Sequence, residues 1–134
     1  MEQEDYLKRQ IDQLGRVLGK ILTKLLGLGS NGQASQRIET TNQILKEESD
    51  LNIQELIDLK TDGFINTLIS EKNFTHKNLD QLAEILLLIA DSKPDKDKKN
   101  IYEKCLTIYE YLETAEKTYA FDRQMKIKQL KNRL

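Results

Sequence analysis

The chain has 134 residues, with 21 Lys and Arg against 22 Asp and Glu, so its formal net charge at pH 7 is −1. This balance excludes the global positive field that draws a protein onto nucleic acid. One proline, one cysteine and no tryptophan exclude a disulfide scaffold and a proline-rich linker protein. The length suits one domain, residues 1–134, whose core needs no metal or disulfide.

The distribution of cysteine and apolar residues predicts a compartment. Cys105 is the only cysteine, which favours a reducing cytoplasm. The first residues, Met-Glu-Gln-Glu-Asp, are acidic, whereas a secretory signal begins with basic residues. The most apolar stretches, 21–28 and 82–90, are far shorter than the ~20 residues of a membrane span. We therefore expect a soluble cytoplasmic protein.

The residue types favour helix throughout. Leu and Ile dominate the apolar set, Val occurs once, and Glu, Gln and Lys are abundant. Straight-chain residues lose little rotamer freedom in a helix, and no stretch shows the period of two that marks a strand. We expect an all-α fold, a compact bundle of six to seven helices.

The first predicted helix runs from about residue 4 to 26. Its apolar residues step alternately by four and three, which is the a/d seam of packed helices: Leu7, Ile11, Leu14, Leu18, Ile21, Leu25 and Leu28. Such a seam is buried against other helices of the chain or against a second copy, and the pattern leaves both open. Glycines at 27, 29 and 32 predict that the helix ends in a loop over 27–32.

The central helices are expected over residues 33–91. One spans about 33–48, a short one follows Asn52, and another begins after Asp62-Gly63. A longer helix over about 77–91, opened by Thr75 or His76, is apolar on nearly every side in its second half. That pattern is typical of a helix surrounded by others.

The C-terminal third is expected to be a charged loop, residues 92–100, followed by a helix pair over 101–134. The loop contains the only proline. The last helix is expected to start near Thr118 and to turn four apolar residues inward: Phe121, Met125, Leu130 and Leu134.

Two loop motifs resemble ligand sites but lack their context. Gly27-Leu-Gly-Ser-Asn-Gly32 has the spacing of a dinucleotide-binding turn, but a helix rather than a strand precedes it. Asp95-x-Asp97 resembles the start of an EF-hand, but its glycine and closing Glu positions hold Asn100 and Leu106. A flexible loop over 27–32 is the better interpretation, and we predict no cofactor.

The residues able to carry catalysis or bind metal are few. Cys105 lies on the apolar stripe of its helix, which favours a buried hydrophobe over a nucleophile. His76 has no second His or Cys to share a zinc ion with it. The carboxylates are spread along charged helices without a distinct acid/base pair. We predict no catalytic residue and no metal site, and the chain is expected not to be an enzyme.

Two basic segments are candidate contacts for an anionic surface. In residues 16–26, Arg16, Lys20 and Lys24 lie opposite a leucine face, an arrangement found on membrane surfaces and in partner grooves. Residues 117–134 hold six basic residues and one acid, Asp122. Four of them could face phosphates: Arg123, Lys126, Lys131 and Arg133. The alternative interpretation is that the leucines pack internally and the tail cations complement a helix C-terminus.

Residues 101–109, after the apolar helix 82–90, resemble the second helix of a tetratricopeptide-type pair. Tyr102, Cys105 and Leu106 occupy its aromatic, small and leucine places. The sequence departs from the pattern at Leu86, lacks the closing proline and has a long connection. The resemblance implies helix-pair packing toward the C-terminus, and a single repeat is below the three of an independent solenoid.

The opening pattern Asp5-Tyr-Leu-Lys-Arg-Gln-Ile-Asp-Gln-Leu14 resembles the start of a family of small bacterial all-helical proteins of unknown function. Such proteins continue through a Leu-rich middle to a tetratricopeptide-like end. The resemblance implies a fold and a bacterial cytoplasm, and it brings no catalytic residue.

These observations together predict a non-catalytic module that binds a protein partner of unknown identity. The first helix is the candidate self-association surface, through Leu7, Ile11, Leu14, Leu18, Ile21 and Leu25, which would make a homodimer. The alternatives are a membrane-surface protein that uses residues 16–26 and, less favoured, a nucleic-acid-binding protein that uses residues 117–134.

Overall fold

The computed structural model describes residues 2–28, 34–91, 93, 95–117 and 120–134, without the side chains of residues 2–7, 11, 28, 34 and 35. The described residues contain no strand, and the predicted all-α fold is confirmed. The elements in chain order are α1 (Glu2–Leu28), α2 (Ala34–Glu48), α3 (Ile53–Asp58), α4 (Phe64–Asn66), the π-helix η2 (Thr67–Glu71), α5 (His76–Ala90), α6 (Asp95–Glu116) and α7 (Phe121–Arg133).

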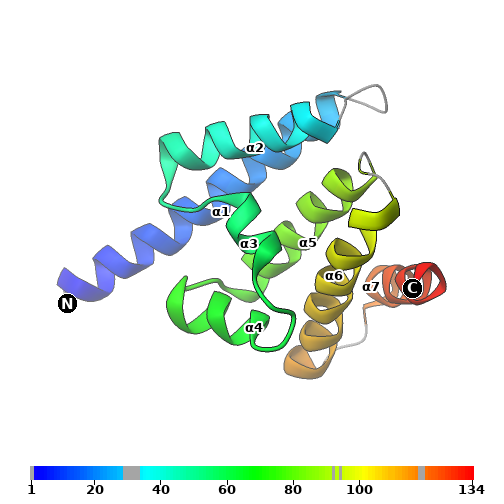
Figure 1. Ribbon diagram of the computed structural model, residues 1–134. Coiled ribbons are helices and arrows are strands. Elements are labelled where there is room, and N and C mark those ends of the chain that lie inside the picture. Colours follow the sequence, from blue (N-terminus) through cyan, green and yellow to red (C-terminus); the bar gives the residue numbers. More distant parts are fainter. Residues whose placement is uncertain (1, 29–33, 92, 94, 118–119) are drawn as a thin grey trace.

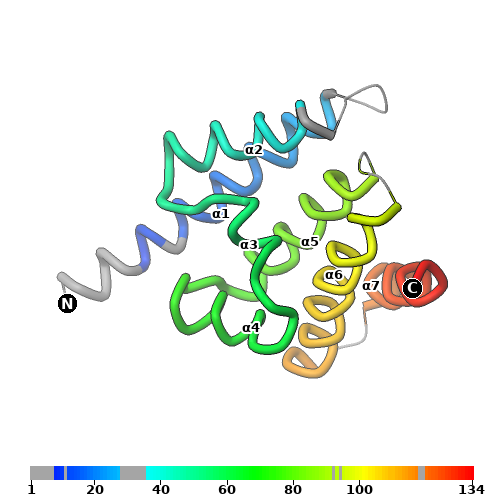
Figure 2. Tube along the Cα trace, in the orientation of Figure 1, coloured from blue at the N-terminus to red at the C-terminus, as the bar shows by residue number. Residues whose placement is uncertain are grey.

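Helix α5 lies at the centre of the arrangement. It packs against α1 on one side and α6 on the other, while α2 contacts both α1 and α5 (Figure 1). The path of the chain passes from the α1–α2 pair through α3 and α4 to α5, and then through α6 to α7 (Figure 2). Helix α7 packs on α6 at the far side from α1, so the two terminal helices lie at opposite sides of the molecule.

The apolar pattern of α5 places it inside the bundle. Its side chains are fully buried at Leu79, Leu82, Ile85, Leu86 and Ile89. Thr75 caps the helix: its hydroxyl accepts from the Asn78 backbone N–H at 3.1 Å, and the Asn78 side chain accepts from the Thr75 N–H at 3.0 Å. The prediction of a central helix opened by Thr75 is confirmed.

Two helix C-termini receive a polar side chain from a distant helix. Arg37 of α2 donates to the carbonyl of Leu88 near the end of α5. At α3, the Ile57 carbonyl accepts from the Asn100 amide at 3.2 Å, and Asn100 in turn accepts from the buried Lys104 ammonium at 2.8 Å. Carbonyls at a C-terminus have no partner within their own helix and attract positive charge. These contacts fasten α2 to α5 and α3 to α6.

The predicted loop over residues 92–100 is wrong for its second half, because α6 already begins at Asp95. The proline and the density of charges indicated a loop. Asp95 and Asp97 instead lie in the first turn of α6, where carboxylates interact favourably with the helix dipole.

Helix α1 continues through Gly27 to Leu28, past its predicted end at residue 26. The remainder of the predicted loop, residues 29–32, lies outside the described residues.

The predicted inward face of the last helix is confirmed at Leu130 and wrong at the other three residues. Phe121 is 64% exposed and Met125 is 45% exposed, and Leu134 is exposed as well. The buried apolar side chains of α7 are Ile127 and Leu130. The helix is rotated so that its basic residues, rather than Phe121 and Met125, face the rest of the molecule.

Adjacent leucines on α1 give a direct test of this packing. Leu25 is fully buried, whereas Leu26 is 65% exposed. We expect Leu25→Ala to lower the free energy of unfolding by about 2–5 kcal/mol, because it leaves a cavity in the core. The same truncation at Leu26 should change it by less than about 0.5 kcal/mol. Urea unfolding followed by circular dichroism measures both, and equal losses would contradict the orientation of α1.

Candidate interaction surfaces

Four residues of the predicted α1 seam are covered within the chain. Leu14, Leu18, Ile21 and Leu25 are buried within this one chain. They pack against α5 and α2, so these four residues are not a surface for a second copy, which corrects that part of the prediction. Leu7 and Ile11 fall outside the described side chains, although both belong to the helical backbone of α1.

The N-terminal half of α1 extends past the end of α2 (Figure 1). We call residues 2–13 the α1 overhang. Every side chain described between positions 8 and 13 is exposed, namely Lys8, Arg9, Gln10, Asp12 and Gln13. The heptad spacing places Leu7 and Ile11 at the same register as the buried Leu14 and Leu18. The overhang is therefore an amphipathic helix beyond the reach of α2.

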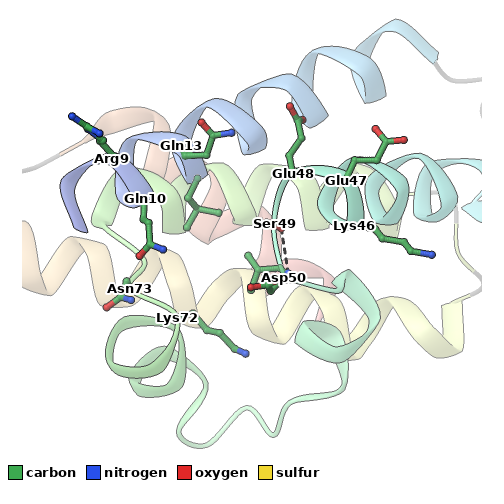
Figure 3. A pocket seen from close by; sticks show the side chains of 12 residues that line it. Arg9, Gln10, Gln13, Lys46, Glu47, Glu48, Ser49, Asp50, Lys72 and Asn73 are labelled. Carbon is green, nitrogen blue, oxygen red and sulfur yellow. Dashed lines mark hydrogen bonds between the residues drawn. The ribbon is translucent and has the colours of Figure 1, made fainter. Parts of the chain in front are cut away.

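A cavity of about 750 Å³ lies beside the overhang. We call it the α1 groove. Figure 3 shows Gln10, Lys72 and Asn73 on one side of it and Glu48, Ser49 and Asp50 on the other. Leu14 and Leu51 supply its apolar surface. The Ser49 hydroxyl accepts a hydrogen bond from the Leu51 N–H at 3.2 Å, which fixes the turn after α2. Three cations and three carboxylates line it: Arg9, Lys46, Lys72, Glu47, Glu48 and Asp50.

The groove does not coincide with the ionisable groups whose pKa values are shifted. Burial raises the pKa of Asp80 and of Tyr109, and it lowers the pKa of Lys104, but none of these residues lines the groove. An active site usually joins a pocket to perturbed acids or bases. The cavity therefore combines mixed charge with some apolar area and contains none of these three groups.

The basic stripe on α1 is exposed, as its spacing predicts. Arg16, Lys20 and Lys24 face solvent, and Lys20 forms an ion pair with Glu48 of α2 at 3.3 Å. The apolar face opposite the stripe is buried in the bundle. An amphipathic helix enters a membrane surface through its apolar face, so that mode of contact would require α1 to leave α5.

The basic residues of α7 point toward carboxylates of the same chain. Arg123 lies 3.2 Å from Glu113 and 2.8 Å from Glu116, and both members of the first pair are nearly covered, at 14% and 15% exposure. The other three candidates also meet acids: Lys126 and Glu84 at 3.4 Å, Lys131 and Glu110 at 4.0 Å, and Arg133 and Asp91 at 3.8 Å. All four candidate phosphate contacts thus lie within ion-pair distance of a carboxylate, and the side chains of Lys131 and Arg133 are also more than half exposed.

Beneath α7 lies a buried hydroxyl. Tyr109 of α6 is fully buried, and its Oη makes no hydrogen bond with any described residue. The Lys126 ammonium lies 5.5 Å from the centre of the Tyr109 ring, in cation–π geometry. Desolvation, with smaller contributions from nearby carboxylates, raises the pKa of Tyr109. The Tyr109 hydroxyl is thus covered without a hydrogen bond to the described protein atoms, whereas most buried polar atoms in native proteins are paired.

The two residues best suited to catalysis are not brought together. Cys105 is sealed in the core, where its Sγ lies 3.5 Å from the Ala83 carbonyl and burial raises its pKa. His76 is exposed and packs edge-on against Tyr111. The expected burial of Cys105 is confirmed. Among the residues with described positions, no three His, Cys, Asp or Glu are placed to share a metal ion.

The sequence reasoning missed the α1 groove and the acidic residues that receive α7. The groove joins segments distant in the chain, so no local pattern marks it. Glu110, Glu113 and Glu116 do carry a signal, because a spacing of three puts them along one side of α6. That row faces the basic residues of the next helix.

The chain matches no protein-family model, no curated protein and no solved structure. The resemblances to a tetratricopeptide-type pair and to a bacterial helical family therefore stay predictions. None of the helices in the described part of the chain carries an apolar stretch long enough to cross a bilayer.

The burial of Cys105 predicts an inert thiol. In the folded protein we expect no reaction with Ellman's reagent, since the thiolate is the reactive form and the sulfur is covered. After unfolding in urea, the thiol should react to completion, which serves as the control. Rapid reaction of the native protein would contradict the position of Cys105 in the core.

The environment of Asp80 predicts how stability depends on pH. Burial, assisted by the charge of Glu84, raises its pKa above the ordinary 3.8. The folded state then holds this proton more strongly than the unfolded state. The stability that protonated Asp80 contributes to the folded state is fully present below pH 3.8. It is lost as the pH rises through the raised pKa of Asp80.

Asp80→Asn removes the cost of the buried charge while keeping the side-chain shape. We expect the stability of this variant relative to wild type to increase as pH rises above about 4 and then to level off. Urea unfolding at a series of pH values measures it. A stability difference that is constant from about pH 4 to 8 would contradict this role of Asp80.

Proposed function

We propose that this chain is a non-catalytic protein-interaction module that pairs with a second copy of itself through the α1 overhang. The observation that supports the proposal is the α1 overhang, whose described polar side chains from position 8 to 13 are all exposed and whose sequence continues the apolar seam at Leu7 and Ile11. The C-terminal part of the seam is buried by α2 and α5. An amphipathic helix gains most of its stability from packing its apolar face.

A second copy suits the overhang because the seam has the spacing of paired helices. In an antiparallel pairing of two overhangs, Leu7 of one copy would face Ile11 of the other across a two-fold axis. Such an isologous contact is the commonest way in which soluble proteins form dimers. It would bury the end of the seam that the sequence continues N-terminal to Leu14.

Charge supports the same pairing. The overhang begins with Glu2, Glu4 and Asp5 in the sequence. In the antiparallel arrangement these acids would approach the partner's groove, where Arg9, Lys46 and Lys72 offer cations beside the carboxylates of Glu47, Glu48 and Asp50. Opposite charges across a contact favour the correct register and suppress others.

The two alternatives have less support. For a membrane-surface role, residues 16–26 present the exposed cations Arg16 and Lys24, but their apolar face is buried in the bundle. A nucleic-acid role for residues 117–134 would use cations that already meet carboxylates. The same proposal includes a cytoplasmic location, which rests on the single cysteine. It also includes tetratricopeptide-like packing of α5 with α6, which rests on residues 101–109.

Substitution in the overhang tests the pairing. We expect Ile11→Asp to raise the dissociation constant of the dimer about tenfold or more, because loss of one buried large apolar side chain costs about 1.5–3 kcal/mol. Light scattering coupled to size-exclusion chromatography at several concentrations measures the mass. Thr23→Asp, the same charge change at an exposed site on α1 outside the overhang, is the matched control.

A wild-type chain that is monomeric at every concentration would overturn self-association. Leu14 and Leu18 are unsuitable for this test, because both are buried and a charge there would unfold the monomer. Circular dichroism of Ile11→Asp establishes that the helices are retained, so that a change of mass is not a consequence of unfolding.

A further inference from the structure

The side of the α5–α6 pair that receives α7 is lined with carboxylates. Glu84 and Asp91 lie on α5, and Glu110, Glu113 and Glu116 lie on α6. Each of them has a basic partner on α7. We call these five residues and Tyr109 the acidic face. It is complementary to an amphipathic helix that carries cations beside a short apolar strip.

Helix α7 contacts the acidic face through ion pairs placed around two buried apolar side chains. Of its apolar side chains only Ile127 and Leu130 are buried, while Phe121 and Met125 on the opposite side are exposed. The Arg123 guanidinium, between Glu113 and Glu116, is the best covered of its ionic contacts. The Gln124 amide donates to Glu113 at 2.7 Å. Exposed ion pairs contribute roughly 0–1 kcal/mol each and weaken with salt.

The fit of α7 to the acidic face is incomplete in two places. The Tyr109 hydroxyl beneath it has no hydrogen-bond partner among the described residues. A cavity of about 160 Å³ lies between α5 and α7, lined by Leu87 and Asp91 on one side and by Lys126, Gln129, Leu130 and Arg133 on the other. A helix with a larger apolar residue at the place of Gln129 would fill more of this cavity.

Removal of α7 would leave the principal core intact. All other buried apolar residues of the described chain belong to the elements from α1 to α6. Helix α7 packs on α6 and reaches α5 through the side chains of Lys126 and Arg133. Segments with few buried apolar contacts are the ones that open locally at low free-energy cost.

We propose that the acidic face is a binding site for a basic amphipathic helix of a partner protein, and that α7 occupies it as a displaceable internal ligand. The partner helix would carry cations at the spacing of Arg123, Lys126 and Arg133 around two apolar residues three apart. Because α7 is tethered, it competes at an effective concentration in the millimolar range. The acidic face is therefore available to a partner only when the contacts of α7 are weakened or when the partner helix binds more tightly than α7.

The test uses the full chain and a defined probe, a fluorescein-labelled synthetic peptide with the sequence of residues 117–134. In the variant Arg123→Glu with Lys126→Glu, α7 no longer matches the acidic face. We expect the peptide to bind this variant at least about tenfold more tightly than wild type in fluorescence anisotropy, because the tethered competitor is disabled. The affinity should fall as sodium chloride is added.

Three further arms identify the site. A peptide that itself carries Arg123→Glu and Lys126→Glu should lose binding. When Glu113→Gln is added to the double-variant protein, its affinity for the wild-type peptide should fall. A peptide that carries Gln129→Leu should bind the double-variant protein more tightly than the wild-type peptide does. Equal affinity of the peptide for wild type and variant, or indifference to Glu113, would overturn the proposal.

Hydrogen exchange of the wild-type chain tests the displacement of α7 even if the double variant does not fold. The amides of α7 should lose protection as salt is raised, while those of α5 and α6 keep theirs. Protection of α7 that equals that of α5 at every salt concentration would contradict a displaceable helix. This experiment is independent of dimerisation, which concerns α1 at the opposite side of the molecule.

Discussion

The structure depends on the burial of one helix. Helix α5 is in contact with α1, α2 and α6, and its leucines and isoleucines are inaccessible to water except Leu87 and Leu88, which are partly buried. Hydrophobic burial at a shared helix positions everything around it: the seam of α1 is covered because α5 lies against it, and α6 is fixed on the other side. The surfaces that remain exposed are those that this packing does not cover.

Much of this arrangement could be predicted from particular residues. The alternating steps of four and three in α1 identify the buried Leu18 and Ile21, and the dense apolar run of α5 identifies the centre of the bundle. Thr75 marks a helix start because a hydroxyl there can satisfy a free N–H. These features are local, so the pattern within one helix is sufficient to find them.

The errors arose where the deciding partner lies elsewhere in the chain. Phe121 and Met125 have the spacing of a buried face, yet Arg123 meets Glu113 and Glu116 and turns that face outward. For the same reason the α1 groove was invisible, since α1, the end of α2 and the turn after η2 form it together. Residues 95–100 were mistaken for a loop because dense charge is compatible with both a loop and an exposed helical turn.

The contact between Asn100 and Ile57 ties a short helix to a distant part of the chain. Helix α3 has six residues, fewer than an isolated helix needs to persist in water. Its N-terminus is held by Asn42 of α2, whose side chain accepts from the Ile53 N–H, and its C-terminal carbonyl finds a donor 43 positions further along the chain. The connection between α2 and α5 is therefore anchored at both ends of α3 by helices on either side of it.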